Sequence, residues 1–129
     1  MGSEPHRTGA LLLGAGCLPF AAAALAGPDG DAGVLPPCPF RAATGLPCPL
    51  CGATRAFALA GRGDGGWTAY NAPWVVLAAL AALTGALVLA GALPLGRLRI
   101  ARRPLAAGVV VFVAVAWAYA LAQRGTIVG

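Results

Sequence analysis

Charged side chains are scarce in this chain of 129 residues, and their scarcity disfavours a soluble fold. Only 10% of the residues are charged and 59% are hydrophobic, whereas soluble domains have about 25% charged and about 45–50% apolar residues. The apolar residues also come in long blocks, without the spacing that would leave one face of a helix or strand wet. The lipid bilayer is therefore the expected environment and the first expected partner.

Three blocks lack charged side chains altogether, and each has the length of a membrane span, about 17–25 residues. They cover residues 9–27, 74–93 and 105–122. The first block shares features with a secretory signal, but its apolar run is longer than the usual core of about 7–15 residues. We therefore expect an all-α integral membrane protein in which residues 1–129 form a single domain with three transmembrane helices. Close helix contact is favoured by small residues in the second span: Gly85, Ala86 and Gly91.

The connector between the second and third spans contains no acidic residue and four arginines: Arg97, Arg99, Arg102 and Arg103. The positive-inside rule places such a short loop in the cytoplasm. In a multi-pass protein of the cell membrane, the N-terminus is then cytoplasmic, and residues 28–73 and the C-terminus are extracytoplasmic. Aromatic residues that prefer the membrane boundary all fall on the same outer side: Trp67, Tyr70, Trp74, Trp117 and Tyr119.

The net charge of +5 does not indicate a nucleic-acid partner. The basic residues cluster beside a membrane span rather than along an aromatic-rich groove, so anionic lipid headgroups are the simpler partner. The other partners expected of such a membrane module are a second membrane protein or a further copy of this chain.

Prolines and glycines punctuate the extracytoplasmic segment. Up to Pro47 they break any regular element, which predicts a loop. The pattern then predicts a short helix with Cys48 as its cap and Pro49 at its first position. Gly61 or Gly63 would end it. Because this helix is too short to cross the membrane, we expect it to be interfacial or re-entrant.

Cysteines are few, but three of the four lie together in this segment: Cys38, Cys48 and Cys51. The C-x-x-C spacing of the last two suits a tetrahedral metal ion, a reactive dithiol or a structural disulfide. For a metal, the ligand set is incomplete, because the lone His6 is expected across the membrane. We therefore expect no cofactor, with zinc held by the three cysteines as the alternative. The fourth cysteine, Cys17, lies in the first span and is expected to be a buried small hydrophobe.

Two further roles of the cysteines stay open. For redox chemistry, the predicted helix start would lower the pKa of Cys48 and favour its thiolate. The sequence lacks the strand and helix pattern of a thioredoxin-like domain, and no acid or base lies nearby, so an enzyme is not expected. For a structural role, extracytoplasmic thiols tend to pair, and Cys48 with Cys51, or Cys38 with either, would pin the loop to the helix.

Arg55 is the candidate anion-binding residue of the segment. On a helix that begins at Cys48, Arg55 shares a face with Cys48 and Cys51, where it would bind a thiolate or a lipid headgroup. The alternative is an ion pair with Asp64 across the following turn. Asn71 comes just before the second span and is expected to cap that helix.

The stretch from Cys38 to Trp74 resembles the signature of a family of small bacterial membrane proteins catalogued as domain of unknown function 2752. The family pattern is C-P-x-x-x-x-T-G-x-x-C-P-x-C-G-x-T-R, followed by a short apolar helix, a G-D turn and N-P before a hydrophobic span. Two departures are Leu50, where relatives commonly carry glycine, and Ala72, which is inserted between Asn71 and Pro73. The matching residues are Cys38, Pro39, Thr44, Gly45, Cys48, Pro49, Cys51, Gly52, Thr54, Arg55, Gly63, Asp64 and Asn71.

The resemblance covers the chain from Cys38 to the end of the second span, and it implies a location in a bacterial inner membrane with no defined biochemistry. We expect a non-enzymatic membrane module whose cysteine and arginine loop serves structure or binds a partner protein, a lipid headgroup or a metal. The alternative is a membrane thiol–disulfide redox component that uses Cys48 and Cys51.

Overall fold

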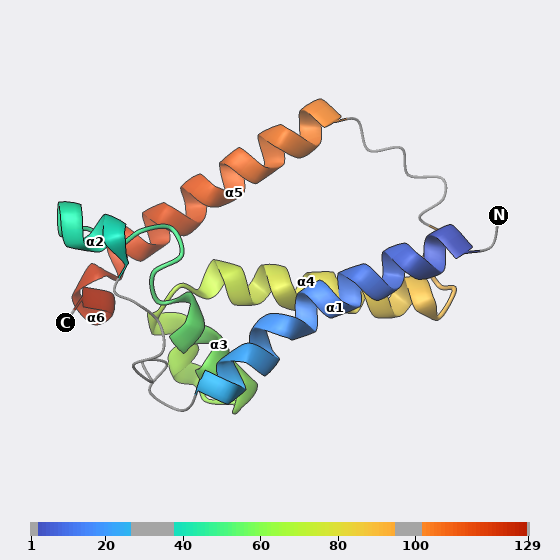
Figure 1. Ribbon diagram of the computed structural model, residues 1–129, viewed down its shortest axis with the longest axis horizontal. Helices are drawn as coiled ribbons and strands as arrows, with labels where there is room; N and C mark the ends of the chain where they lie inside the picture. The colour runs from blue at the N-terminus through green and yellow to red at the C-terminus, as the bar shows by residue number, and fades with distance from the viewer. Residues whose placement is uncertain (1–2, 27–37, 95–101, 129) are drawn as a thin grey trace.

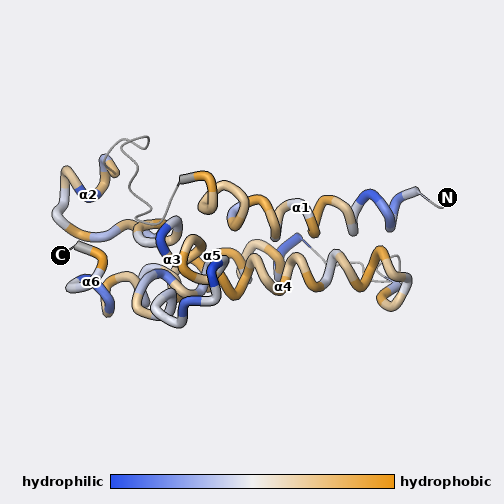
Figure 2. Tube along the Cα trace, turned by 90° about the horizontal axis from the view of Figure 1, so that it is seen from below, coloured by the Kyte–Doolittle hydropathy of each residue, from blue (hydrophilic) through white to orange (hydrophobic). Residues whose placement is uncertain are grey.

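The computed structural model describes residues 3–26, 38–94 and 102–128, and every regular element in those ranges is a helix (Figure 1). Three helices are long and apolar enough to cross a membrane: α1 (Ser3–Ala26), α4 (Ala72–Leu89) and α5 (Arg102–Ala122). Hydrophobic residues dominate all three (Figure 2). The prediction of an all-α protein with three candidate transmembrane helices is confirmed. The shorter elements are α2 (Pro39–Thr44), α3 (Ala53–Gly61), the 3₁₀ helix η1 (Gly65–Ala69) and α6 (Arg124–Val128).

The short elements gather at one end of the long helices (Figure 1). At that end α1 and α5 finish and α4 begins, so successive long helices run in opposite directions. The start of α1, which carries His6, lies at the other end. The lone histidine and the cysteine segment are therefore far apart, as the sequence predicts.

Glycines bring α1 and α4 into backbone contact. A Cβ atom added at Gly16 of α1 would lie 2.5 Å from the carbonyl oxygen of Ala78 and 2.5 Å from the amide nitrogen of Ala82. One added at Gly85 of α4 would overlap the backbone nitrogen of Leu13. Small residues allow this close approach in a membrane, where van der Waals packing drives helix association. The expected role of Gly85 in close helix contact is confirmed.

Gly91 has a different role, because it ends α4. Its φ of +74° lies in the left-handed region, its N–H donates to the Val88 carbonyl, and the Ala92 N–H donates to the Leu87 carbonyl. This pair of bonds satisfies the last carbonyls of the helix in a Schellman motif. The helix therefore finishes at Leu89, four residues before the predicted end of the second span.

α3 packs against the ends of α1 and α4. The rings of Phe57 in α3 and Phe20 in α1 meet edge to face at 5.0 Å, and Ala56 is completely buried. Small side chains from the three helices fill the cluster around Phe57, including Ala23, Val75 and Ala78. The predicted short helix after the C-x-x-C motif is therefore present, and its apolar face is covered by the spans.

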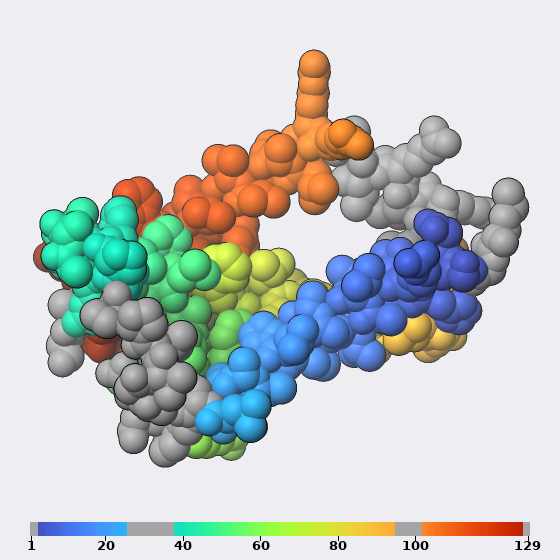
Figure 3. Space-filling view, viewed as in Figure 1, coloured from blue at the N-terminus to red at the C-terminus, as the bar shows by residue number. Residues whose placement is uncertain are grey.

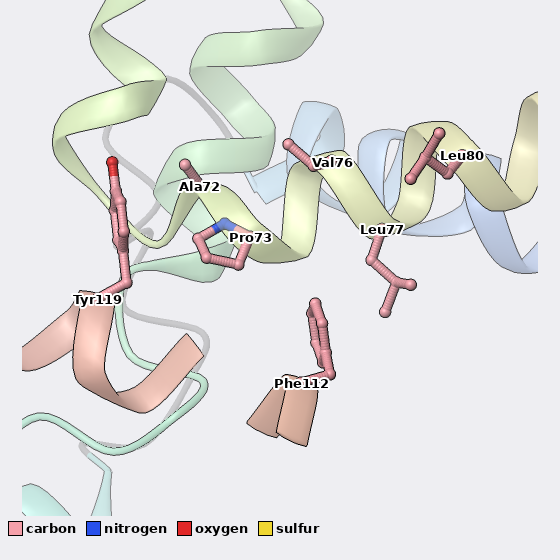
Figure 4. A pocket seen from close by; sticks show the side chains of 7 residues that line it. All are labelled: Ala72, Pro73, Val76, Leu77, Leu80, Phe112 and Tyr119. Carbon is pink, nitrogen blue, oxygen red and sulfur yellow. The ribbon is translucent and has the colours of Figure 1, made fainter. Parts of the chain in front are cut away.

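α5 stands apart from the other two long helices. Only 11% of its most apolar 18-residue stretch is buried. It meets α4 through the rings of Phe112 and Trp74, which lie edge to face with their centres 5.0 Å apart. The surface is hollowed between α5 and the α1–α4 pair (Figure 3). A cavity of about 400 Å³ lies there, and Figure 4 shows its lining side chains: Ala72, Pro73, Val76, Leu77, Leu80, Phe112 and Tyr119. This apolar surface suits contact with lipid.

Candidate functional site

The structure brings together the three cysteines that the sequence singles out. The Sγ atoms of Cys38, Cys48 and Cys51 all lie within 4.8 Å of one another, and each residue is half-buried. The Sγ atoms of Cys48 and Cys51 are 3.2 Å apart. All three cysteines are free thiols. A region of 14 residues (38–51) thus folds back on itself so that its first and last residues meet.

Cys48 does not cap a helix, contrary to the sequence prediction. Residues 48–52 form a turn, in which the Cys51 N–H donates to the Cys48 carbonyl at 3.0 Å. Gly52 follows with a φ of +79°, a left-handed conformation that a side chain would strain, and α3 begins only after it, at Ala53. The helix dipole therefore does not act on Cys48. Arg55 no longer shares a helix face with both cysteines.

The Cys-Pro step that opens a helix is instead the earlier one. Cys38 occupies the cap position of α2, Pro39 is its first residue, and Gly45 ends it with a φ of +71°. Proline at a first position and left-handed glycine after the last turn are the usual limits of a helix. The sequence predicts a loop here, and that prediction is wrong for Pro39–Thr44, which form α2. The residues from 27 to 37, which the sequence also assigns to this loop, lie outside the described part of the chain.

Asn71 binds the cysteine turn from a distant part of the sequence. Its Nδ2 atom donates to the carbonyl of Pro49 at 2.6 Å and to that of Cys51 at 3.2 Å. The side chain is completely buried, and its Oδ1 atom has no hydrogen-bond partner. Asn71 does hold the cap position of α4, but its side chain makes no cap hydrogen bond. The predicted capping role is therefore wrong, and the residue secures the turn instead.

Two tryptophans complete the anchoring of this turn. The indole N–H of Trp74 in α4 donates to the Pro49 carbonyl at 2.8 Å, and that of Trp117 in α5 donates to the Pro47 carbonyl at 3.1 Å. Pro47 is fully buried. Buried carbonyls need donors, and these bonds supply them. The sequence identifies both tryptophans only as membrane-boundary residues, and nothing in their spacing indicates their partners.

The surroundings of Cys38 and Cys51 change their acidity in opposite directions. The backbone N–H of Arg41, followed by the thiol of Cys48, lowers the pKa of Cys38 from 9.0. Burial, followed by the neighbouring Cys48 thiol, raises the pKa of Cys51 to about 11. In the metal-free, reduced site, Cys51 is therefore a protonated thiol at neutral pH, and Cys38 ionises more readily.

Arg55 and Cys17 are the two remaining residues that the sequence singles out. The guanidinium carbon of Arg55 lies 5.4 Å from the centre of the Tyr70 ring, in the geometry of a cation–π contact. Cys17 is exposed on the surface of α1, although the sequence predicts a buried residue. On a helix of this apolar character, an exposed cysteine suits contact with lipid.

The cluster offers sulfur ligands and nothing else within the described residues. There, no histidine, aspartate or glutamate joins the three cysteines in a group that could hold a metal. Thiolate ligands suit Zn²⁺ and other thiophilic ions. A single ion bound here would have three protein ligands and one free position.

The fold and the site together define a multi-span α-helical membrane protein with a three-thiol site at one end of its spans. Residues 38–85 match the model of the family described as Protein of unknown function (DUF2752), which confirms the resemblance seen in the sequence. The matched segment contains all three clustered cysteines, Asn71 and Trp74, whereas α1 and Trp117 lie outside it. No curated protein and no solved structure gives a significant match to this chain.

Proposed function

We propose that this protein binds a thiophilic metal ion at the membrane surface through Cys38, Cys48 and Cys51. The observation that carries the proposal is the convergence of three Sγ atoms within 4.8 Å of one another. The sequence alone favours no cofactor, because it supplies only three sulfur ligands. The convergence of these three sulfur atoms in space supports the alternative expectation, a bound zinc ion.

The spacing of the sulfur atoms fits one metal ion. Zn²⁺ binds thiolates at about 2.3 Å, so two thiolates on a tetrahedral ion lie about 3.8 Å apart. The observed separations run from 3.2 Å between Cys48 and Cys51 to at most 4.8 Å within the group. Small rotations of the side chains would bring the three sulfurs to the required distances.

The anchored backbone supports binding as well. The carbonyls of Pro47, Pro49 and Cys51 are held by Trp117, Trp74 and Asn71. A site whose backbone is fixed before the ion arrives loses less conformational freedom on binding. Binding also removes the proton from Cys51, because a metal-bound thiol is deprotonated.

A second candidate function is that of a membrane thiol–disulfide component. The 3.2 Å separation of Cys48 and Cys51 favours it, since the two sulfurs already touch. Metal content separates the two candidates: a redox pair needs no stoichiometric ion, whereas the metal site needs all three cysteines.

We further propose that the site faces the outside of the cell. Arg102 and Arg103 at the start of α5 lie at the end of the spans opposite the cysteine loop, and arginines near span ends favour the cytoplasmic side. Anionic lipid headgroups, a membrane-protein partner or a second copy of the chain are the proposed contacts around it. Arg55, on α3 at the same end, is the proposed anion-binding residue.

Metal analysis tests the proposal directly. The protein is purified in detergent under reducing conditions, loaded with Zn²⁺, freed of excess ion and analysed for zinc per chain. We expect one zinc per chain, and loss of that zinc in Cys38→Ser, Cys48→Ser and Cys51→Ser. Cys17→Ser is the matched control and should retain it. Absence of zinc from the reduced protein, or zinc that survives the three substitutions, would overturn the proposal.

A further inference from the structure

The three thiols of the cluster are not equivalent. Cys48 and Cys51 belong to one turn and have their Sγ atoms 3.2 Å apart. Cys38 belongs to a different segment, at the start of α2, ten residues before Cys48. Cys48 and Cys51 are therefore placed to form a disulfide with each other, and Cys38 is the third thiol outside that pair.

We propose that the metal site is controlled by oxidation, in which a disulfide bond between Cys48 and Cys51 expels the ion and leaves Cys38 as a free thiol. The proposal rests on the proposed metal-binding function and adds its regulation. The co-reactant is a low-molecular-weight or protein disulfide, the class of oxidant that accumulates outside the reducing cytoplasm.

The backbone of the turn already suits this bond. The hydrogen bond from the Cys51 N–H to the Cys48 carbonyl closes a four-residue turn, which keeps its end Cα atoms within about 7 Å. A disulfide requires Cα atoms about 4.4–6.8 Å apart and sulfurs about 2.05 Å apart. The two sulfurs would approach by about 1.1 Å from their present separation of 3.2 Å. Rotation of the side chains provides this movement.

The anchors of the turn confine the change to the sulfur atoms. Asn71 and Trp74 hold the Pro49 carbonyl in the middle of the pair, and Asn71 also holds the Cys51 carbonyl. These contacts are to backbone atoms, so they persist whichever state the sulfurs adopt. Oxidation and reduction can then alternate without refolding of the loop.

The exchange balances in atoms and electrons. The Cys48 thiolate attacks one sulfur of the oxidant disulfide, forms a mixed disulfide and displaces the first thiolate of the oxidant. The Cys51 thiolate then attacks the Cys48 sulfur and displaces the second. Cys48 and Cys51 together lose two electrons, and the oxidant gains them as two thiolates that take protons from water. The metal ion loses two of its three thiolate ligands, so that Cys38 is its only remaining sulfur ligand, and it dissociates. Cys38 then takes a proton from water and becomes a free thiol.

Oxidation of the zinc-loaded Cys17→Ser protein by oxidised glutathione tests the proposal. Zinc release is followed with a coloured chelator, and the linked cysteines are identified by alkylation and peptide mass spectrometry. We expect loss of one zinc per chain in step with a Cys48–Cys51 link, with Cys38 still open to alkylation. Dithiothreitol and added zinc should restore the bound ion. In Cys38→Ser, which should not hold zinc, the Cys48–Cys51 link should still form.

The outcomes separate the two proposals. A reduced protein that binds no zinc overturns the metal site and the switch together. A zinc-loaded protein whose Cys48–Cys51 pair resists oxidised glutathione overturns the switch alone. Zinc release that accompanies a link to Cys38, or a Cys48–Cys51 link that leaves the zinc bound, also overturns the switch alone.

Discussion

The Nδ2 atom of Asn71 lies 2.6 Å from the carbonyl oxygen of Pro49, across 22 residues of sequence. This bond ties the first residue before α4 to the middle of the cysteine turn. A proline carbonyl has two lone pairs like any other, so it can accept from the amide of Asn71 and from the indole of Trp74 together. The position of the thiols therefore depends on a residue that offers no sulfur atom itself.

Replacement of Asn71 by leucine should destabilise the protein. The change removes both donated hydrogen bonds, so that the Pro49 carbonyl keeps only its bond from Trp74 and the Cys51 carbonyl loses its side-chain donor. At about 0.5–1.5 kcal/mol for each bond, the loss is about 1–3 kcal/mol. Thermal unfolding in detergent measures the loss. Thr84→Val in the same helix is the control, because the Thr84 hydroxyl donates to the Leu80 carbonyl one turn away in the same helix, and the effect of its loss should stay within about 0.5 kcal/mol. Equal unfolding temperatures for the two variants would contradict the anchoring role.

A valine at Gly16 should disrupt the contact between α1 and α4. Its Cβ atom would meet the backbone of Ala78 and Ala82, which cannot move aside as a flexible side chain would. Overpacking of this kind costs about 1–3 kcal/mol. Gly14 lies on the same helix with open space around it, so Gly14→Val should unfold at the temperature of the unaltered protein. If Gly14→Val were the more damaging change, the helix pairing described above would be wrong.

The three clustered thiols should differ in their reaction with an alkylating reagent. Thiolates react and thiols do not, so a lowered pKa lets Cys38 react at lower pH, and a pKa of about 11 delays Cys51. In the reduced, metal-free protein at about pH 8.5, near the usual thiol pKa, peptide mass spectrometry should find Cys38 modified before Cys51. Rising pH should increase the rate at Cys51 up to about pH 11. Earlier modification of Cys51 would show that burial does not govern its acidity.

An impermeant thiol reagent should reveal the orientation of the chain in intact cells. After reduction, we expect it to label the cysteine cluster, because the positive-inside rule leaves that end outside. A single cysteine placed by Arg103→Cys in a cysteine-free background should react only after lysis. Labelling of the Arg103→Cys protein before lysis would reverse the proposed topology.

The spans could be predicted because membrane burial leaves a signal in composition. A run without charge and of sufficient length is enough to identify them, and the structure shifts their ends by a few residues, as at Leu89. Local turn chemistry was harder to assign. The same Cys-Pro pair occurs twice, and only the structure distinguishes Cys38, which occupies the cap position of a helix, from Cys48, which does not.

The grouping of the cysteines was predictable in part. Their closeness in sequence indicated one site, whereas the approach of Cys38 to the other two depends on α2 and on the left-handed Gly45. The anchors were not predictable from one sequence. Hydrogen bonds from Asn71, Trp74 and Trp117 span between 20 and 70 residues, and composition and periodicity carry no information about contacts so distant.

The bond from Trp117 to Pro47 sets an order of assembly during synthesis. The two residues are 70 positions apart, and at about 5–20 residues per second the ribosome adds Trp117 about 4–14 s after Pro47. Asn71 and Trp74 follow Pro47 by only 24 and 27 positions. The nascent chain can therefore fasten the middle of the cysteine turn to α4 first. The Pro47 carbonyl gains its indole donor only when the third span is made, so each new molecule passes through an interval with a half-secured site.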